Sequence, residues 1–271
     1  MIRLYSALWV LPFFLSHTFC LNAQPKDAPQ LVAVLVVGHV EEETNDHIEQ
    51  MNRVANFFTA HGVKVHKFYD KKAQWKNIFP VARDCHFFVY SGHGGQVNKA
   101  LLPGMLSIDT HVSSDDIRNT LTFNKKALVI FNSVCFAAGS SASDAKDIGF
   151  AEAKRRVLSY AGVFLEVGAS AYYAVNYQNT VVKFLKSFFN GSTLRQACLE
   201  NIFSNCTIET EAKHPIISGY AYSIVSNKGS GLCTSKSYID GRLAEVKNFP
   251  CFKEYNIAFV GPPNFLLSKF Q

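Results

Sequence analysis

Two reactive side chains follow apolar runs of the sequence. His93 lies in the glycine-rich turn 91–95, directly after the run 85–90, and Cys135 follows the run 127–131. A free thiol has a pKa of roughly 8.5, so it is mostly protonated at neutral pH, whereas a neighbouring imidazole helps to form the thiolate and later protonates a leaving amine. These residues predict acyl-transfer chemistry, with Cys135 as nucleophile and His93 as general base.

The glycines around His93 suit the same chemistry. Gly92, Gly94 and Gly95 carry no β-carbon, so the backbone of a substrate can approach closely. The amide N–H of Gly94, together with that of Cys135, can donate to the oxyanion that forms on an attacked carbonyl group. A histidine between glycines is also an unusual residue for a packed core, which favours a functional His93.

Both turns are expected at one edge of a sheet. Continuous apolar runs favour strands buried on both faces of a parallel sheet, and such sheets bind ligands beyond the carboxyl ends of their strands. The repeated β-α-β order predicts an α/β fold, a three-layer α/β/α sandwich with a mostly parallel sheet. The expected strands are 31–37, 63–69, 85–90, 127–131, 169–175 and 216–225, and the expected helices are 45–60, 75–81, 113–121, 150–167, 180–189 and 193–203.

The first residues of the chain predict export. Arg3 precedes a short apolar stretch at 7–15, and small and polar residues follow, so residues 1–23 have the layout of a secretory signal peptide cut after Ala23. A membrane anchor would need roughly 20 apolar residues. Lipidation at Cys20 would need a small residue just before it, which is missing. We expect a secreted or periplasmic, cell-envelope protein with no stable membrane insertion after signal removal.

The mature chain is expected to form one main domain and a small addition. Residues 24–225 hold the repeated strand and helix pattern. The polar, glycine-rich stretch 227–231 is typical of a linker or an exposed loop. Residues 226–271 are therefore predicted to be a small C-terminal extension that packs on the main domain.

Six cysteines remain after signal removal, and an oxidising compartment favours pairing. The nearest candidate pairs are Cys198 with Cys206 and Cys233 with Cys251, although sequence alone leaves other connectivities open. This pairing leaves Cys85 and Cys135 reduced. Cys85, inside an apolar run, is expected to be a buried thiol without a role.

The composition argues against several classes of function. The chain has 271 residues, 48% of them hydrophobic and 18% charged, which suits a folded core rather than disorder. Its formal charge of +6 comes from scattered basic residues rather than a basic face, so we expect no nucleic acid as a partner. Five histidines outside the turn lack metal-ligand spacing, so we expect no metal and no other cofactor. These histidines are His39, His47, His61, His66 and His111.

The two motifs resemble those of a known peptidase clan. An apolar strand followed by His-Gly, and a second apolar strand followed by a small residue and Cys, is similar to the signature of caspases, legumains, clostripain, gingipains, separase and CHAT-domain proteins. The order of the following blocks, 164–170 running into a strand and 191–197 at a helix start, is also similar. The resemblance covers residues 31–225.

The resemblance implies a caspase–haemoglobinase fold and endopeptidase activity on a peptide or protein substrate. It places the dyad on His93 and Cys135 and an oxyanion amide on Gly94. The family usually has Ala or Ser before the cysteine, whereas this chain has Val134. A catalytically inactive module that binds a peptide or protein through the same cleft is therefore the alternative function.

The resemblance also bears on specificity and latency. The pocket strand implied by the family ends near 177, which makes Tyr172, Asn176 and Tyr177 the candidate substrate-binding residues, with the preferred residue left open. Relatives are often made as precursors with loops that are cut or moved. The polar segment 140–156 is predicted to be mobile and to act as a cleavage or gating loop of a zymogen.

Overall fold

A computed structural model describes residues 30–270, apart from short gaps at 98–99, 108–109, 125, 177–179, 201, 203–205, 228, 230–231 and 240–241. The predicted signal peptide 1–23 lies outside the described residues. Within the described part, none of the helices combines the length and the hydropathy of a bilayer span.

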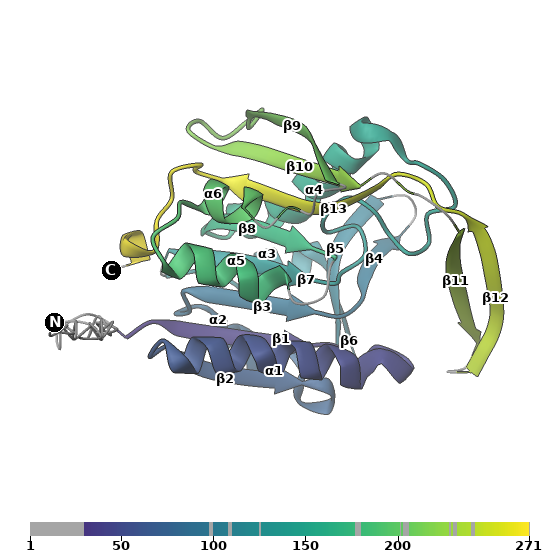
Figure 1. Ribbon diagram of the computed structural model, residues 1–271. Coiled ribbons are helices and arrows are strands. Elements are labelled where there is room, and N and C mark those ends of the chain that lie inside the picture. Colours follow the sequence, from purple (N-terminus) through teal and green to yellow (C-terminus); the bar gives the residue numbers. More distant parts are fainter. Residues whose placement is uncertain are drawn as a thin grey trace, which may run out of the picture.

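A mixed β-sheet runs through the centre of the molecule (Figure 1). Its described strands are β1 (Val32–Val37), β2 (Lys64–Tyr69), β3 (Phe87–Ser91), β7 (Ala127–Asn132), β8 (Ala169–Val175), β9 (Cys206–Lys213), β10 (Ala221–Asn227) and β13 (Glu254–Gly261). Strands β2-β1-β3-β7-β8 are parallel neighbours in this order. From β8 the sheet continues through β13, β10 and β9 with antiparallel pairing. One half of the sheet is therefore parallel, as predicted, and the other half is antiparallel.

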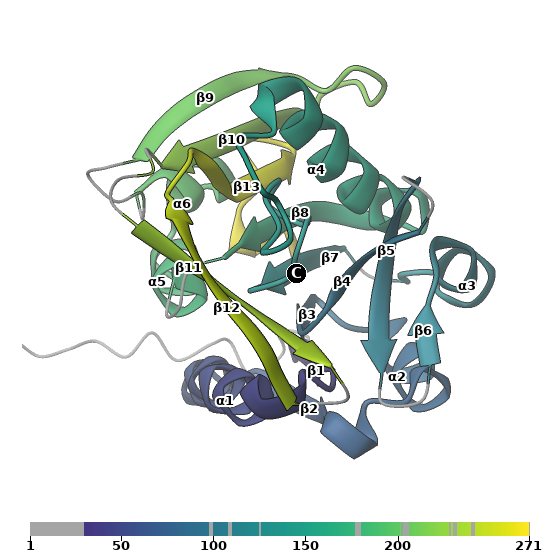
Figure 2. The same ribbon diagram turned by 90° about the vertical axis from the view of Figure 1, so that its right-hand side faces the viewer.

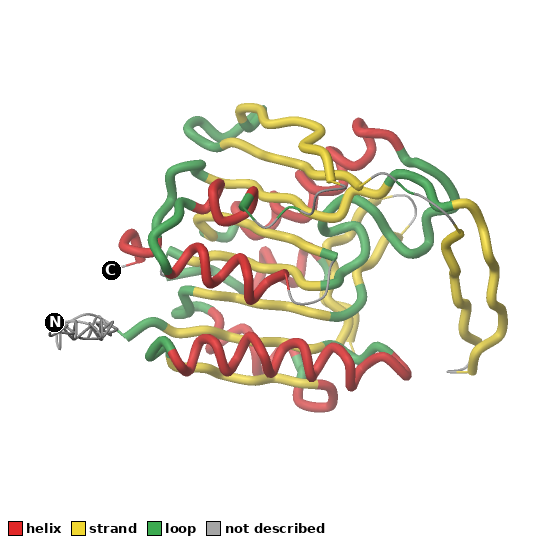
Figure 3. The backbone as a smooth tube through the Cα atoms, in the orientation of Figure 1, coloured by secondary structure: helices red, strands yellow, loops and turns green. Residues whose placement is uncertain are grey.

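Helices cover both faces of the sheet, which gives three layers (Figures 1 and 3). One face carries α1 (Thr44–Ala60), α5 (Thr180–Phe189) and α6 (Leu194–Leu199), and the other carries α2 (Trp75–Ala82), α3 (Ser114–Thr120) and α4 (Gly149–Glu166). Short 3-10 helices are η1 (Glu41–Glu43), η2 (Asp70–Lys72) and η3 (Leu267–Phe270). The predicted α/β class and the two helical layers are confirmed.

The apolar runs form inner strands because each strand packs against a hydrophobic core on both faces of the sheet. Along β1, Val34 and Val36 pack against one helical layer, whereas Ala33, Leu35 and Val37 pack against the other. Successive side chains of a strand point to opposite faces, so a strand that is covered on both sides must be apolar throughout. This is why the runs lack polar alternation.

The boundary predicted at residue 226 is wrong for one strand. β13 pairs with β8 on one side and with β10 on the other, so it is an inner strand of the main sheet. Of the segment after 226, the described hairpin of β11 (Leu232–Ile239) and β12 (Arg242–Pro250) forms a separate two-stranded sheet. This hairpin stands off the main body in Figure 1 and crosses in front of the sheet edge in Figure 2.

A second small sheet was not predicted. Strands β4 (Gly94–Val97), β5 (Ala100–Ser107) and β6 (Thr110–Val112) pair antiparallel and follow directly on the turn that carries His93. The stretch lacks a long apolar run, so its sequence reads as loop. β4 is therefore the strand that directly follows the turn of His93.

The cysteines follow the predicted pairing only in part. Cys85 and Cys135 are thiols, as expected, and Cys251 is disulfide-bonded. Cys198 and Cys206 are also thiols, so the predicted bond between them is not formed. Cys198 is buried in α6, whereas Cys206 begins β9 on the outermost strand of the sheet.

Candidate active site

A cavity of about 1020 Å³ opens where the parallel strands end. The turn 92–94 follows β3, the loop 133–136 follows β7, and Asn176 follows β8. Open α/β sheets bind ligands at this edge. The described residues that line the cavity are Val40, Glu41, Glu42, Glu43, His47, Gly92, His93, Gly94, Ser133, Val134, Cys135, Phe136, Ser140, Ser141, Ala142, Ser143, Asp144, Ala145, Asn176, Asn248, Glu254 and Asn256.

A tight turn carries His93 out of β3. Gly92 takes a φ of 150°, and a β-carbon there would lie 2.6 Å from Oη of Tyr90. The same hydroxyl donates to the carbonyl oxygen of His93 at 3.0 Å. The turn is therefore folded closely over a buried tyrosine, which holds the His93 side chain, 36% exposed, at the cavity.

Glu41 orients the His93 ring. Its Oε2 lies 2.9 Å from Nε2 of His93. An ionised carboxylate can only accept a hydrogen bond, so Nε2 carries the proton, and Nδ1 is the basic nitrogen of the neutral ring. A base held by a third group is the arrangement that activates a nucleophile.

The loop of Cys135 is strained and pinned at several points. Ser133 and Phe136 both have positive φ, at 55° and 69°, although neither is glycine. The backbone N–H of Ser133 donates to Val175 of β8 at 2.7 Å, and that of Phe136 donates to Ser140 at 2.9 Å. Such strain of the backbone persists only where the surrounding structure fixes it, and it clusters at functional sites.

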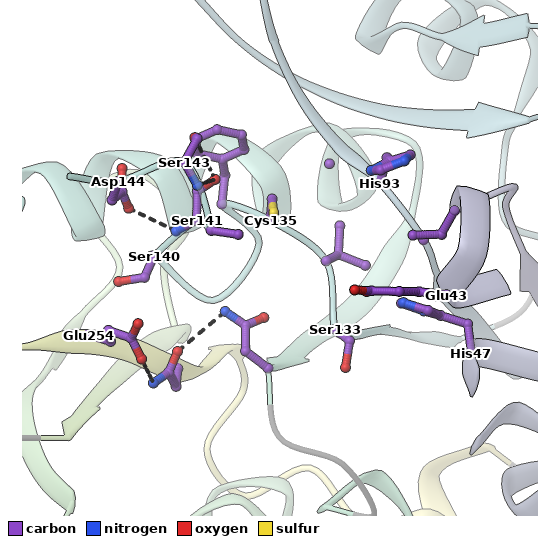
Figure 4. A pocket seen from close by; sticks show the side chains of 18 of the residues that line it. Glu43, His47, His93, Ser133, Cys135, Ser140, Ser141, Ser143, Asp144 and Glu254 are labelled. Atoms are coloured by element: carbon purple, nitrogen blue, oxygen red, sulfur yellow. Dashed lines mark hydrogen bonds between the residues drawn. The ribbon is translucent and has the colours of Figure 1, made fainter. Parts of the chain in front are cut away.

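The two turns touch each other. A β-carbon on Gly94 would overlap the carbonyl oxygen of Cys135 and would lie 2.7 Å from Oη of Tyr160. Only glycine fits here, so the Gly-His-Gly sequence brings the two loop backbones into contact. Cys135 is partly exposed and, like His93, lines the cavity. Figure 4 shows Cys135 between His93 on one side and Glu254 on the other.

Val134, the residue before Cys135, does not bury the Cys135 thiol. Val134 is 1% exposed and packs in the core between the sheet and α2, α3 and α4. The Val134 side chain, which is larger than Ala or Ser, packs beneath the cavity, while the Cys135 thiol stays partly exposed. Cys85, by contrast, is 0% exposed, and burial raises the pKa of its thiol far above the ordinary value. Cys85 is therefore an inert core thiol at neutral pH.

A second histidine, His47, also lines the cavity. Its Nδ1 lies 2.7 Å from Oγ of Ser91, and that hydroxyl donates to the carbonyl oxygen of Asn132 at 2.7 Å. The Ser91 oxygen must then accept from His47, which places the ring proton on Nδ1. Burial lowers the pKa of His47, while the nearby Glu43 carboxylate opposes that shift. His47 is thus a neutral ring that supports the floor of the cavity.

A buried ion pair anchors the loop that follows Cys135. Asp144 accepts from the two terminal nitrogens of Arg156 in α4 at 2.7 and 2.9 Å, and the two side chains are only 7% and 8% exposed. Arg156 also donates to the carbonyl of Gly139 at 3.0 Å, and its guanidinium lies 4.9 Å from the centre of the Phe136 ring. One side chain of α4 therefore fixes the loop at three places.

The prediction of a mobile cleavage loop at 140–156 is wrong for 149–156, whereas Ala142, Ser143 and 145–147 are exposed loop residues for which it stays a prediction. Residues 149–156 belong to α4, so the basic run 154–156 is helical rather than extended. Ser140 and Ser141 are buried as well. Helical, ion-paired and buried residues are poor sites of proteolytic nicking.

The predicted substrate-binding residues have different places. Asn176, one residue beyond β8, lines the cavity as expected. Tyr172 does not, because the alternation of β8 turns its ring into the core, where Oη donates to Ala137 at 2.9 Å and the side chain is 0% exposed. Tyr177 lies outside the described residues.

Several polar residues of the cavity wall were missed by the sequence reasoning. Glu254 and Asn256 come from β13, which runs antiparallel to β8, so its first residues lie beside the ends of the parallel strands. Glu41 and His47 come from the segment after β1. The sequence contains one sign of this wall, because two polar residues, Glu254 and Asn256, begin the otherwise apolar run 254–261.

The comparisons with known proteins identify no family for this chain. No protein-family model matches the sequence, and no curated protein matches it. Among the described residues, no group of three or more His, Cys, Asp and Glu side chains is arranged to hold a metal ion.

Proposed function

We propose that this chain is an exported cysteine endopeptidase of the caspase-like type with a His93/Cys135 dyad. One observation carries the proposal: both residues line one cavity at the carboxyl ends of the adjacent parallel strands β3 and β7. The contact of Gly94 with the Cys135 backbone supports it, because it holds the two turns together. Export depends on the segment 1–23, whose layout is typical of a signal peptide.

Hydrolysis on this site proceeds through an acyl-enzyme. Nδ1 of His93 takes the thiol proton of Cys135, and the thiolate attacks the carbonyl carbon of the scissile bond. A C–S bond forms, the C–N bond breaks, and His93 gives its proton to the leaving amine. A water molecule deprotonated by His93 then attacks the thioester, and release of the carboxylic acid restores the thiol.

The backbone N–H groups of Gly94 and Cys135 are the proposed oxyanion donors. Gly94 lies against the carbonyl of Cys135, and the left-handed residues Ser133 and Phe136 flank the nucleophile. A loop that is already fixed aims its N–H groups without reorganisation during the reaction, and this makes oxyanion stabilisation effective.

A mixture-based fluorogenic peptide library tests the proposal, with wild type, Cys135→Ala and Cys85→Ser compared on it. We expect wild type to cleave peptides and Cys135→Ala to fall to background, because no other group can form the acyl-enzyme. Cys85→Ser should keep nearly full turnover, because its thiol is buried away from the cavity. Loss of activity in Cys85→Ser with activity kept in Cys135→Ala would overturn the assignment. Peptide binding without turnover by wild type would favour the non-catalytic binding module instead.

A further inference from the structure

The cavity is acidic although the chain is basic. The formal charge of the chain is +6, yet the described lining contains five carboxylates and neither Lys nor Arg. Two of the five already face a partner, since Glu41 contacts His93 and Asp144 is paired with Arg156. Glu254 makes no ion pair within the described residues, and it lies across Cys135 from His93 (Figure 4).

Glu254 fixes the orientation of two neighbouring amides. Its Oε2 accepts from Nδ2 of Asn256 at 3.2 Å, because a carboxylate cannot donate. The Asn256 amide therefore turns Oδ1 the other way, where it accepts from Nδ2 of Asn176 at 3.4 Å. The chain of hydrogen bonds thus assigns O and N in both asparagines.

This orientation leaves acceptors at one end of the cavity. Oδ1 of Asn176 is buried and accepts no hydrogen bond within the described structure. Each amide in the chain directs a donor toward Glu254, so these residues hold the Glu254 carboxylate as a negatively charged acceptor at the cavity. Asn256 is only 4% exposed, which shows that the group is built into the wall rather than lying on the surface. A ligand that fits has positive charge and several N–H donors.

The same group lies next to the nucleophile in the fold. Tyr255, between Glu254 and Asn256, makes two hydrogen bonds with Ser140: its N–H donates to the side-chain Oγ at 2.8 Å, and its carbonyl accepts from the Ser140 N–H at 3.0 Å. Ser140 in turn accepts from the N–H of Phe136, the residue after Cys135. The loop of Cys135 is therefore hydrogen-bonded to β13, the strand that carries Glu254.

We propose, on the basis of the peptidase function above, that Glu254 with Asn256 and Asn176 binds the side chain before the scissile bond and selects Arg or Lys. A guanidinium or ammonium group supplies the charge and the donors that this end of the cavity lacks. Glu254 is then the specificity-determining residue, and the two asparagines hold its carboxylate in place.

Paired fluorogenic peptides that differ only in Arg or citrulline before the scissile bond test this assignment. Citrulline keeps the shape of arginine and removes its charge. Wild type should cleave the Arg peptide about 100-fold faster in kcat/KM, since hydrogen bonds to charged groups discriminate on this order. Glu254→Gln should lose most of that preference, whereas Glu49→Gln, an exposed acid on α1 paired with Arg53, should keep it.

Binding to Cys135→Ala separates this inference from the peptidase proposal. Fluorescence anisotropy of the same two peptides should show Arg bound at least 10-fold more tightly than citrulline, with the difference lost in Cys135→Ala/Glu254→Gln. Cleavage after Asp or Asn, or equal treatment of Arg and citrulline, overturns the cationic site and leaves the peptidase standing. Selective binding of the Arg peptide without turnover by wild type overturns the peptidase and keeps the site. If wild type cleaves neither peptide and Cys135→Ala binds neither, both proposals are overturned.

Discussion

At the scale of single residues, Glu41 sets the proton position on His93. We expect Glu41→Gln to lower kcat by about 10-fold and to leave KM nearly unchanged, because the ring loses its fixed orientation but not its basic nitrogen. His93→Ala should cost about 10²- to 10⁴-fold in kcat and leave a trace of activity from residual thiolate and the oxyanion amides. Steady-state kinetics measure both. An unchanged kcat in Glu41→Gln would show that Glu41 does not position the base.

His47 gives the fold a dependence on pH. Burial lowers the pKa of His47 below its ordinary value, so an unfolded chain binds a proton that the folded chain refuses. The free energy of unfolding should therefore be full above about pH 6.5, the ordinary histidine pKa, and fall as the pH drops through the folded pKa. Urea unfolding at pH 7.5 and pH 5 should show a smaller loss in His47→Gln than in wild type. An equal loss in both would assign the acid sensitivity to other groups.

Single residues also show what the sequence could predict. His93 and Cys135 were found because their chemistry and their place after apolar runs are visible in the sequence itself. Glu254 was not found, because its place in the cavity of Cys135 depends on an antiparallel strand that pairs with β8. Tyr172 was misplaced because the resemblance gave its strand but not which of its side chains face the cavity.

At the scale of elements, α4 holds the loop after Cys135 through Arg156. Arg156→Leu leaves the buried carboxylate of Asp144 without its partner, which should cost about 3 kcal/mol of unfolding free energy. Arg155→Leu, one residue earlier on the same helix, removes an exposed ion pair with Glu152 and should cost less than about 1 kcal/mol. Urea unfolding compares the two variants. Equal losses would mean that the buried pair does not anchor the loop.

Elements with strong periodicity were predicted well, and weakly patterned ones were not. The runs that became β1, β3, β7 and β8 are apolar throughout, because two helical layers cover them. The helix predicted at 150–167 is α4, which begins at Gly149, so the loop predicted at 140–156 overlapped the first two turns of this helix. Its buried face includes Arg156, whose guanidinium is paired with Asp144 in the preceding loop and with Glu152 on the helix itself. Tertiary pairing of this kind leaves no mark on local propensity.

At the scale of the whole molecule, the chain after residue 226 completes the main sheet. A chain cut back to 24–225 loses β13 and should not fold, because β8 and β10 are then left without the strand that joins them. Replacing 228–253 by Asn-Gly should preserve folding, since Asn227 and Glu254 are already paired across the ladder and a two-residue turn can close it. Circular dichroism and cooperative urea unfolding test both chains. Cooperative folding of 24–225 would restore the original domain boundary.

Thiol labelling tests the proposed roles of Cys135 as nucleophile and His93 as its base. A peptidyl acyloxymethyl ketone alkylates a catalytic thiolate, and trypsin separates the thiols, because Cys135 lies alone in peptide 127–146 and Cys85 alone in 84–99. Mass spectrometry of the labelled native protein should find one adduct, on Cys135. The adduct should be absent in Cys135→Ala and should form much more slowly in His93→Ala. An adduct on Cys85, or a Cys135 that reacts equally fast without His93, would rule out this dyad.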